Sequence, residues 1–391
     1  MQTEQEKTQT NKEGRITKCV GGLYSVRFPD GSEIACKAKG AFRHDGEKPI
    51  AGDIVAVRIG SSDEAMGREA AEDETGISGA DKASDKKAAK SPAAGADMAS
   101  DEPSREAVRI SEREGALIES IKPRKNELVR PPLANLDIIF VVMAAAKPAP
   151  ILTTFDKLIC LAEYLNIEPV VIITKADVDP ERASELMEIY KKSGFKVFKT
   201  DMGSEAEKER LRGFILNEAG DKLSCFAGAS GVGKSTLMTT LFPNLNLKTG
   251  EISRKISRGK QTTRHVELYP ISSLIDAKPG GSAVSDGTET ERPGAAKVNP
   301  PIGFIADTPG FSLLDFVRLD FFTKEDLPYC FREFDRYIGK CRYTKCTHLK
   351  EEGCAIVESV KNGEIPKERH DSFVEIYAEL KNKHEWDKKP R

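Results

Sequence analysis

The chain has 391 residues, of which 39% are hydrophobic and 31% charged, and its formal net charge is −2. This length allows two or three domains with real hydrophobic cores. The near-balance of charge excludes a protein that binds nucleic acid through bulk positive charge, so such a partner would have to meet a local basic patch. No apolar stretch approaches bilayer-spanning length, and the first 14 residues are polar rather than signal-like. We therefore expect a cytoplasmic protein without a membrane partner.

The N-terminal third predicts a small β-barrel. Residues 1–13 are polar and are expected to form a disordered tail. From Arg15, short apolar runs with partial alternation are separated by turn residues such as Gly21-Gly22, a pattern typical of barrels. Residues 61–106 lack aromatic residues and are rich in Ala, Ser, Asp and Lys, which predicts a disordered insertion. Val108–Arg124 would then supply the last strand, because a long solvated loop adds little closure entropy.

The middle of the chain alternates apolar runs with segments of helical periodicity. Its nearly continuous apolar strands are typical of a parallel sheet covered on both faces. This predicts a doubly wound α/β domain whose ligands bind at the carboxyl ends of the strands. A second low-complexity insertion is expected at 272–300. The predicted strands are Leu136–Ala145, Pro169–Thr174, Val197–Thr200, Leu223–Phe226, Val266–Tyr269 and Ile302–Ala306, and the predicted helices are Thr153–Asn166, Pro180–Ser193, Ser204–Ala219 and Ser235–Leu241.

One strand-to-helix junction has the pattern of a phosphate-binding loop, G-x-x-x-x-G-K-[ST]. Glycines let successive backbone N–H groups point at phosphate oxygens, and the helix N-terminus adds its positive dipole end. Lys234 would reach the β- and γ-phosphates, and the Ser235 hydroxyl would bind Mg²⁺. The predicted nucleotide-binding residues here are Gly228, Ala229, Ser230, Gly231, Val232, Gly233, Lys234, Ser235 and Thr236.

A second motif, Thr174-Lys175-Ala176-Asp177, ends another predicted strand. The Asp177 carboxylate can accept two hydrogen bonds from the N1–H and N2–H₂ edge of guanine, whereas adenine offers no such donor pair. The stem of Lys175 would lie over the base. In a chain with a phosphate loop, this motif predicts that the nucleotide is GTP rather than ATP.

Two further segments predict a magnesium-dependent switch. Asp307-Thr308-Pro309-Gly310 ends the last predicted strand, where Asp307 would hold Mg²⁺ through water and the Gly310 N–H would meet the γ-phosphate. In the stretch Gly259–Arg264, either Thr262 or Thr263, with Thr263 preferred, would complete the magnesium shell. The predicted magnesium-binding residues are thus Ser235, Thr263 and Asp307.

The motifs stand in an unusual order, because the base-binding motif precedes the phosphate loop. In an ordinary small GTPase the phosphate loop comes first. Relocated chain ends explain the difference, since surface termini that lie close together tolerate circular permutation. The segment after Gly310 then leads directly into the C-terminal region, so that nucleotide state could be transmitted to that region.

The C-terminal region contains a cluster with metal-ligand spacing, C-x₄-C-x-H-x₅-C. Three thiolates and one imidazole describe a closed tetrahedral site for one structural Zn²⁺ per chain, with no position left for water. Its residues are Cys341, Cys346, His348 and Cys354. Cys330 lies outside this spacing and is expected in the core.

Together, the motif order, the barrel-like start, Gly259–Arg264 and the late Cys/His cluster resemble the circularly permuted small ribosomal subunit biogenesis GTPases, the RsgA family, also called YjeQ or YloQ. Arg130-Pro131 and Ala134–Asp137 are also similar. The resemblance runs from about Gly14 to about Tyr377, apart from the two insertions. Where the family more often has a histidine, this chain has Gln261, so no mechanism based on that histidine carries over.

The resemblance implies a multidomain protein. Its parts would be an N-terminal OB-fold β-barrel that binds RNA, a circularly permuted P-loop α/β GTPase domain, and a C-terminal α-helical zinc-binding domain. It further implies a GTP hydrolase that assists late maturation of the 30S small ribosomal subunit, binds rRNA, and couples nucleotide state to release or checking of the subunit. The corresponding domain limits are 14–125, 126–317 and 318–391.

The catalytic group that positions water is left open. Where Ras-like enzymes place a glutamine after their Asp-x-x-Gly motif, this chain has Phe311, which cannot orient a nucleophile by hydrogen bonding. We therefore expect slow intrinsic turnover that the small subunit stimulates, with Gln261 or a ribosomal group positioning the water. The catalytic candidates are Lys234, Thr263 and Gln261.

Two basic patches are candidates for contact with rRNA in a monomeric protein. The alternatives are a regulatory GTP-binding switch that acts on a protein partner, and an ATP-dependent kinase or ATPase. The aromatic residues Tyr24, Phe28 and Phe42 suit a barrel core as well as a stacking surface. The patches consist of Arg254, Lys255, Arg258, Lys260 and Arg264, and of Lys340, Arg342, Lys345 and Lys350.

Overall fold

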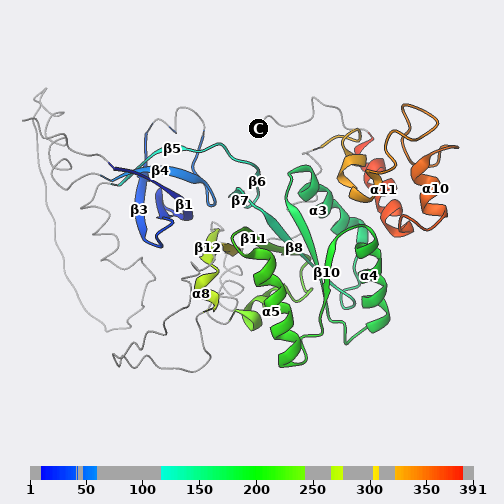
Figure 1. Ribbon diagram of the computed structural model, residues 1–391, viewed down its shortest axis with the longest axis horizontal. Coiled ribbons are helices and arrows are strands. Elements are labelled where there is room, and N and C mark those ends of the chain that lie inside the picture. The colour runs from blue at the N-terminus through cyan, green and yellow to red at the C-terminus, as the bar shows by residue number, and fades with distance from the viewer. Residues whose placement is uncertain are drawn as a thin grey trace, which may run out of the picture. The chain divides into compact units, whose positions relative to one another are not determined.

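The computed structural model describes residues 10–40, 42, 47–59, 116–242, 266–275, 303–307 and 322–381 (Figure 1). Its contacts divide the chain into two compact units. The first comprises the chain up to Arg15 together with residues 21–49 and 54–122, and the second comprises Ile16–Val20, Ile50–Asp53 and the chain from Pro123 onward. The expected insertion at 61–106 and the stretch Gly259–Arg264 lie outside the described residues.

Five strands form a closed barrel in the order β1-β2-β3-β5-β4, with β4 pairing back onto β1 from Thr10↔Ile59 to Arg15↔Ile54. Strand β3 is parallel to β5, whereas β2–β3 and β4–β5 are antiparallel. Tyr24 and Phe28 are buried in the barrel, which favours the core over the stacking interpretation for both. The predicted OB-like barrel is therefore confirmed, but its first strand begins at Thr10, so the last four residues of the expected disordered tail 1–13 belong to the barrel because they pair with β4. Its strands are β1 (Thr10–Val20), β2 (Leu23–Arg27), β3 (Glu33–Ala38), β4 (Ile54–Ile59) and β5 (Leu117–Ile121).

The second unit is built on a sheet in the order β10-β9-β8-β11-β13-β12. The first five strands are parallel, and β12 runs antiparallel to β13. Every residue of β8 and β11 is buried, as their apolar runs predicted. The strands are β8 (Ile138–Ala144), β9 (Glu168–Thr174), β10 (Lys196–Lys199), β11 (Leu223–Gly228), β12 (Glu267–Pro270) and β13 (Phe304–Asp307).

Four helices alternate with these strands and pack on the sheet (Figure 1). The alternation confirms the predicted doubly wound domain, and the element limits agree with the predicted ones to within two residues. A short helix, α8 (Ser272–Ile275), continues the ordered chain into the stretch expected as a second insertion, because Ile271 and Leu274 are buried in the core. The four helices are α3 (Leu152–Tyr164), α4 (Pro180–Lys192), α5 (Glu205–Ala219) and α6 (Lys234–Leu241).

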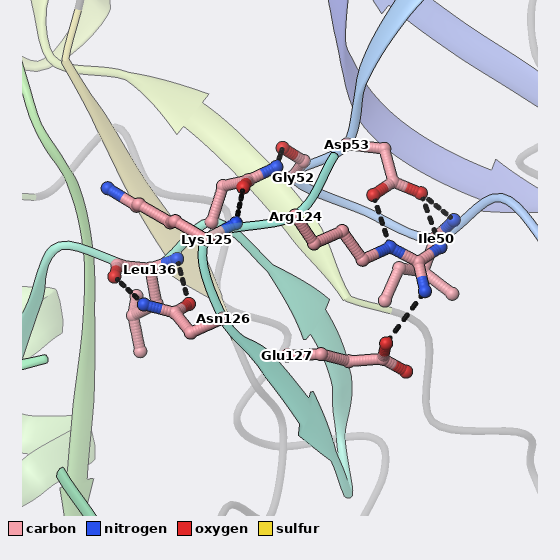
Figure 2. A network of polar contacts seen from close by, with 9 residues as sticks. Ile50, Gly52, Asp53, Arg124, Lys125, Asn126, Glu127 and Leu136 are labelled. Atoms are coloured by element: carbon pink, nitrogen blue, oxygen red, sulfur yellow. Dashed lines mark hydrogen bonds and ion pairs between the residues drawn. The ribbon is translucent and has the colours of Figure 1, made fainter. Parts of the chain in front are cut away.

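A polar network holds Ile50–Asp53 within the second unit, although this segment lies between two barrel strands in the sequence (Figure 2). The carboxylate of Asp53 is fully buried and receives Arg124 Nε at 2.7 Å and Nη2 at 2.8 Å. The side chain of Asn126 pairs with both backbone groups of Leu136, at 2.8 and 2.9 Å. Paired, hydrogen-bonded charges of this kind are tolerated in a core. The segment is therefore an integral part of the second unit.

Just after this network, a hairpin of β6 (Glu127–Val129) and β7 (Pro132–Ala134) precedes β8. The C-terminal region, from residue 322, consists of two 3₁₀ helices followed by two α-helices packed around the rings of Phe331, Phe334 and Phe373. This confirms the predicted C-terminal helical domain. Its helices are η1 (Leu327–Cys330), η2 (Arg332–Phe334), α10 (Ala355–Lys361) and α11 (Lys367–Leu380). Across the described parts of the chain, every helix is too short or too polar to cross a bilayer.

Candidate functional site

The predicted nucleotide-binding motifs meet at one edge of the parallel sheet. Strands β9, β8, β11 and β13 are neighbours, so their carboxyl ends lie side by side. The register pairs Ala144 with Thr174 and Val142 with Gly228. The base-binding motif after β9 and the phosphate loop after β11 are therefore adjacent, although more than 50 residues separate them in the sequence.

Glycines shape the phosphate loop. Gly231 and Gly233 have φ angles of 79° and 93°, a region that favours glycine. At Gly228 a side chain would collide with the carbonyl oxygen of Val142 on the neighbouring strand. Gly233 is the N-cap of α6, so Lys234, Ser235 and Thr236 form the first turn of this helix. Backbone N–H groups of a first helical turn point outward from the helix end, as a phosphate-binding loop requires.

Thr174 and Lys175 fasten the base-binding motif to the phosphate loop. The Thr174 hydroxyl donates to the Val232 carbonyl, with an O···O distance of 2.6 Å. Lys175, which has a φ of 57°, donates from Nζ to the carbonyl of Gly231 at 2.8 Å and also to that of Lys147. The side chain predicted to cover the base thus also joins three loops.

The carboxylate predicted to bind the base is exposed, because Asp177 lies beyond the buried strand end. The N–H of Ala176, which precedes Asp177 in the chain, donates to the Thr200 carbonyl at 3.2 Å. The loop that begins there, after β10, carries no recognisable motif in the sequence. Its turn is held by the Met202 N–H on the Thr200 hydroxyl and by the Gly203 N–H on Asp201. In the sequence, only the predicted strand Val197–Thr200 indicates that the loop after it lies at the same edge of the sheet as the two motifs, because the carboxyl ends of parallel strands share one edge.

Other predicted switch residues are only partly covered by the described chain. Asp307 ends β13, which pairs with β11 from Leu223↔Phe304 to Cys225↔Ala306, so its backbone lies at the same edge. Gln261, Thr262, Thr263 and Gly310 lie outside the described residues.

The four predicted zinc ligands come together in the C-terminal region. Their ligand atoms all lie within 4.8 Å of one another. His348 Nδ1 is 3.5 Å from the sulfurs of both Cys341 and Cys354, which are 3.9 Å apart. A tetrahedral ion with Zn–S bonds of about 2.3 Å and a Zn–N bond of about 2.0 Å would separate two sulfurs by about 3.8 Å, and sulfur from nitrogen by about 3.5 Å. The arrangement therefore fits zinc.

Local electrostatics agree with this fit. Burial raises the pKa of Cys354 and raises that of Cys346 to about 12, so neighbouring thiols ionise together only with a cation to bind them. Burial lowers the pKa of His348 and favours the neutral imidazole that metals bind. The His348 carbonyl accepts a hydrogen bond from His370 Nε2 at 2.8 Å, which orients the ligand residue from α11.

Basic residues flank the members of the cluster in the sequence. Lys340, Arg342, Lys345 and Lys350 are all exposed, and the Arg342 guanidinium lies 5.6 Å from the ring centroid of Tyr343, itself half exposed. The structure therefore presents this predicted patch to solvent. The other patch, from Arg254 to Arg264, falls outside the described chain.

Comparisons with known families and proteins agree with this architecture. Residues 121–286 match the family described as RsgA GTPase, and residues 13–66 match the RsgA N-terminal domain. The small ribosomal subunit biogenesis GTPase RsgA of Caldanaerobacter subterraneus subsp. tengcongensis is 33% identical over 372 residues, which cover 95% of this chain and 96% of the relative. The protein of the same name from Bacillus subtilis is 31% identical over 389 residues, covering 97% and 99%.

Solved structures share the fold. YloQ, a circularly permuted GTPase, matches with a TM-score of 0.62 and 26% identity over the full length of both chains. YjeQ from Thermotoga maritima matches with a TM-score of 0.63 and 24% identity, covering 96% of this chain and all of that one. The order of motifs along the sheet is thus that of a permuted GTPase. The chain belongs to the RsgA family of circularly permuted GTPases.

Proposed function

We propose that this protein is a GTP hydrolase that assists late maturation of the small ribosomal subunit. The observation that carries the proposal is the direct attachment of the base-binding motif to the phosphate loop, through Thr174 on Val232 and Lys175 on Gly231. The name shared by its relatives, small ribosomal subunit biogenesis GTPase, supports the choice of partner.

Each part of the site then has a role in binding GTP. Asp177 accepts from the guanine edge, and the backbone of Gly228–Thr236 holds the phosphates. Lys234 is half buried with its Nζ 3.1 Å from the Gly228 carbonyl, close to where the β- and γ-phosphates would lie. The loop Thr200–Ser204 would form a second wall of the base pocket, and the hydrogen bond from the Ala176 N–H to the Thr200 carbonyl next to Asp177 supports this role. Thr174, Lys175 and Ala176 set the position of this pocket.

Magnesium would be held beside the phosphates by Ser235, by Thr263 or Thr262, and by Asp307. The exposed Ser235 in the first turn of α6 fits this role. When bound, the ion supplies positive charge to the transferring phosphoryl group. Lys234 adds charge there, Gly310 contacts the γ-phosphate, and Gln261 or a group of the ribosome positions the attacking water.

The remaining regions would make the ribosome contact. We propose that residues 14–125 bind rRNA as an OB-fold and that residues 126–317 form the GTPase domain. Residues 318–391 would hold one structural zinc ion and present the exposed basic patch around it to rRNA. Phosphate contacts of this kind depend on salt, and the protein would act as a cytoplasmic monomer.

Subunit-stimulated hydrolysis tests the proposal. Single-turnover GTP hydrolysis should be slow for the protein alone and should accelerate by at least tenfold with 30S subunits, but not with 50S subunits. Equal rates in all three conditions would contradict it. A switch that acts on a protein partner would instead show no co-sedimentation with 30S subunits in the presence of a non-hydrolysable GTP analogue.

A further inference from the structure

Helix α3 belongs to two hydrophobic cores at once. Phe155, Leu158 and Ile159 pack in the core of the GTPase sheet. Cys160, on the same helix, is fully buried in the separate core of the C-terminal domain, next to which Tyr164 also packs. Because interiors are close-packed, a helix shared in this way cannot shift in one core without disturbing the other.

A buried ion triad fastens the C-terminal domain to α3. Arg369 on α11 donates to Asp156 on α3, and its Nε donates to Glu333 at 2.7 Å. Asp156 and Arg369 are fully buried and Glu333 is 5% exposed. The Tyr190 hydroxyl from α4 donates to Asp156 at 3.0 Å, so the GTPase domain also supplies a neutral partner. The guanidinium lies 4.6 Å from the centroid of Phe331, a ring of the C-terminal core.

Further polar contacts extend the attachment along the whole helix. Near its start, Thr153 hydrogen-bonds to Glu375, and Lys157 binds both oxygens of Glu379 at 2.6 and 2.7 Å. Near its end, Arg332 of η2 binds Glu163 at 2.7 Å and also contacts Glu168 at the start of β9. The C-terminal domain therefore holds α3 at its start, middle and end.

The other end of this connection is the nucleotide site. Residues 145–151 link β8 to the start of α3, and within them the Lys147 carbonyl accepts a hydrogen bond from Lys175 of the base-binding motif. A Cβ atom on Gly231 of the phosphate loop would lie 3.7 Å from Pro148. The segment that leads into α3 thus hydrogen-bonds to the base-binding motif and lies beside the phosphate loop.

We propose that α3 couples docking of the C-terminal domain to nucleotide binding, with Asp156, Glu333 and Arg369 acting as positioning residues for the segment 145–151. This inference rests on the proposed GTP binding. The nucleotide site and the C-terminal domain would then be coupled in two ways: through side-chain contacts along α3, and through the chain segment that follows Gly310. That segment lies outside the described residues up to residue 321. Because coupling between two sites is reciprocal, bound nucleotide stabilises docking by the same factor by which docking strengthens nucleotide binding.

Three variants of the full chain test the coupling through affinity for a fluorescent GDP analogue. R369M leaves two buried carboxylates without their cation and should weaken binding by roughly five- to tenfold. D156N/E333Q/R369M removes all three charges at similar volume and should bind within about twofold of the unaltered chain. K361M, which removes an exposed ion pair with Glu358 on α10, is the matched control and should leave affinity unchanged.

Hydrogen exchange on the unaltered chain provides a test that needs no variant. Bound GDP should slow amide exchange in α11 as well as in residues 145–151. Protection confined to the nucleotide loops, or unchanged affinity in a folded R369M, would overturn the coupling while leaving GTP binding intact. An unaltered chain that binds no GDP would overturn the proposed function and the coupling together.

Discussion

At the scale of single residues, the proposed selectivity for GTP depends on the carboxylate of Asp177. The substitution Asp177→Asn replaces one acceptor oxygen by an amide donor, which opposes a donor on guanine. An unmatched polar group in a binding site costs about 1–3 kcal/mol, so GTP affinity should fall about 5- to 150-fold. The new amide can donate to the N1 acceptor of adenine, which the carboxylate could not, so ATP affinity should rise modestly and the preference for GTP should narrow. Competition binding with both nucleotides measures the effect.

Glu181→Gln is the matched control for this substitution. Glu181 is exposed in the first turn of α4, close in sequence to Asp177, and loses the same charge. A similar fall in GTP affinity in both variants would mean that the lost negative charge, rather than the hydrogen bonds to guanine, causes the fall. An unchanged GTP affinity in Asp177→Asn would mean that Asp177 does not contact the base.

At the scale of elements, the zinc loop depends on one carboxylate. Glu351 accepts from the backbone N–H groups of Thr347 at 2.8 Å, Leu349 at 3.0 Å and Lys350 at 3.1 Å. Partial burial raises the pKa of Glu351, but the hydrogen bonds from the Thr347 hydroxyl and from the backbone N–H groups of Glu351, Thr347 and Lys350 outweigh it and lower this pKa to about 2. One side chain thus fixes the backbone on both sides of His348. It binds Thr347, which lies between Cys346 and His348, and it binds Leu349 and Lys350, which lie between His348 and Cys354.

Glu351→Gln should therefore release zinc to a chelator about tenfold faster, in the range found when groups supporting a metal ligand are removed. Because its pKa is lowered in the folded protein, the ionised Glu351 carboxylate stabilises the fold at pH values above 4.5, the pKa of an ordinary glutamate. This stabilisation is lost as the pH falls from 4.5 towards 2. The ratio of the zinc-release rates of the Glu351→Gln variant and the unaltered chain should thus be constant from pH 6 to 8. Glu352→Gln, at an exposed neighbour, is the control, and equal release from both would contradict the assignment.

The sequence predicted the strands of the sheet to within two residues, because a strand that is covered on both faces has a continuous apolar sequence. It also predicted which strand ends carry Thr174, Gly228 and Asp307. It could not predict the ion triad, since the partners of Arg369 lie 213 and 36 residues away in the chain. Locally, Arg369 is one charged residue among several on a polar helix. Long-range pairing, unlike periodicity, leaves no mark in the neighbouring residues.

At the scale of the whole molecule, the long segment between β4 and β5 separates the final two strands of the barrel. These strands nevertheless pair closely, from Val55↔Ile121 to Arg58↔Leu117, so the chain leaves and re-enters the barrel at neighbouring positions. A short linker can span such neighbours. The barrel could therefore close with a much shorter segment between β4 and β5.

Replacing residues 62–113 by six Gly/Ser residues should leave the barrel folded and raise its unfolding free energy by at most about 1.5 kcal/mol, because loop-closure entropy grows only with the logarithm of length. Urea unfolding of the full chain measures this change. GDP affinity should not change, since the predicted nucleotide-binding segments Thr174–Asp177 and Gly228–Thr236 lie at the ends of β9 and β11, in the other unit. A chain that keeps the native length but scrambles residues 62–113 separates length from sequence. A large loss of stability in both variants would mean that the native segment contributes ordered structure to the barrel, whereas a loss of 30S binding alone would make it part of the ribosome contact.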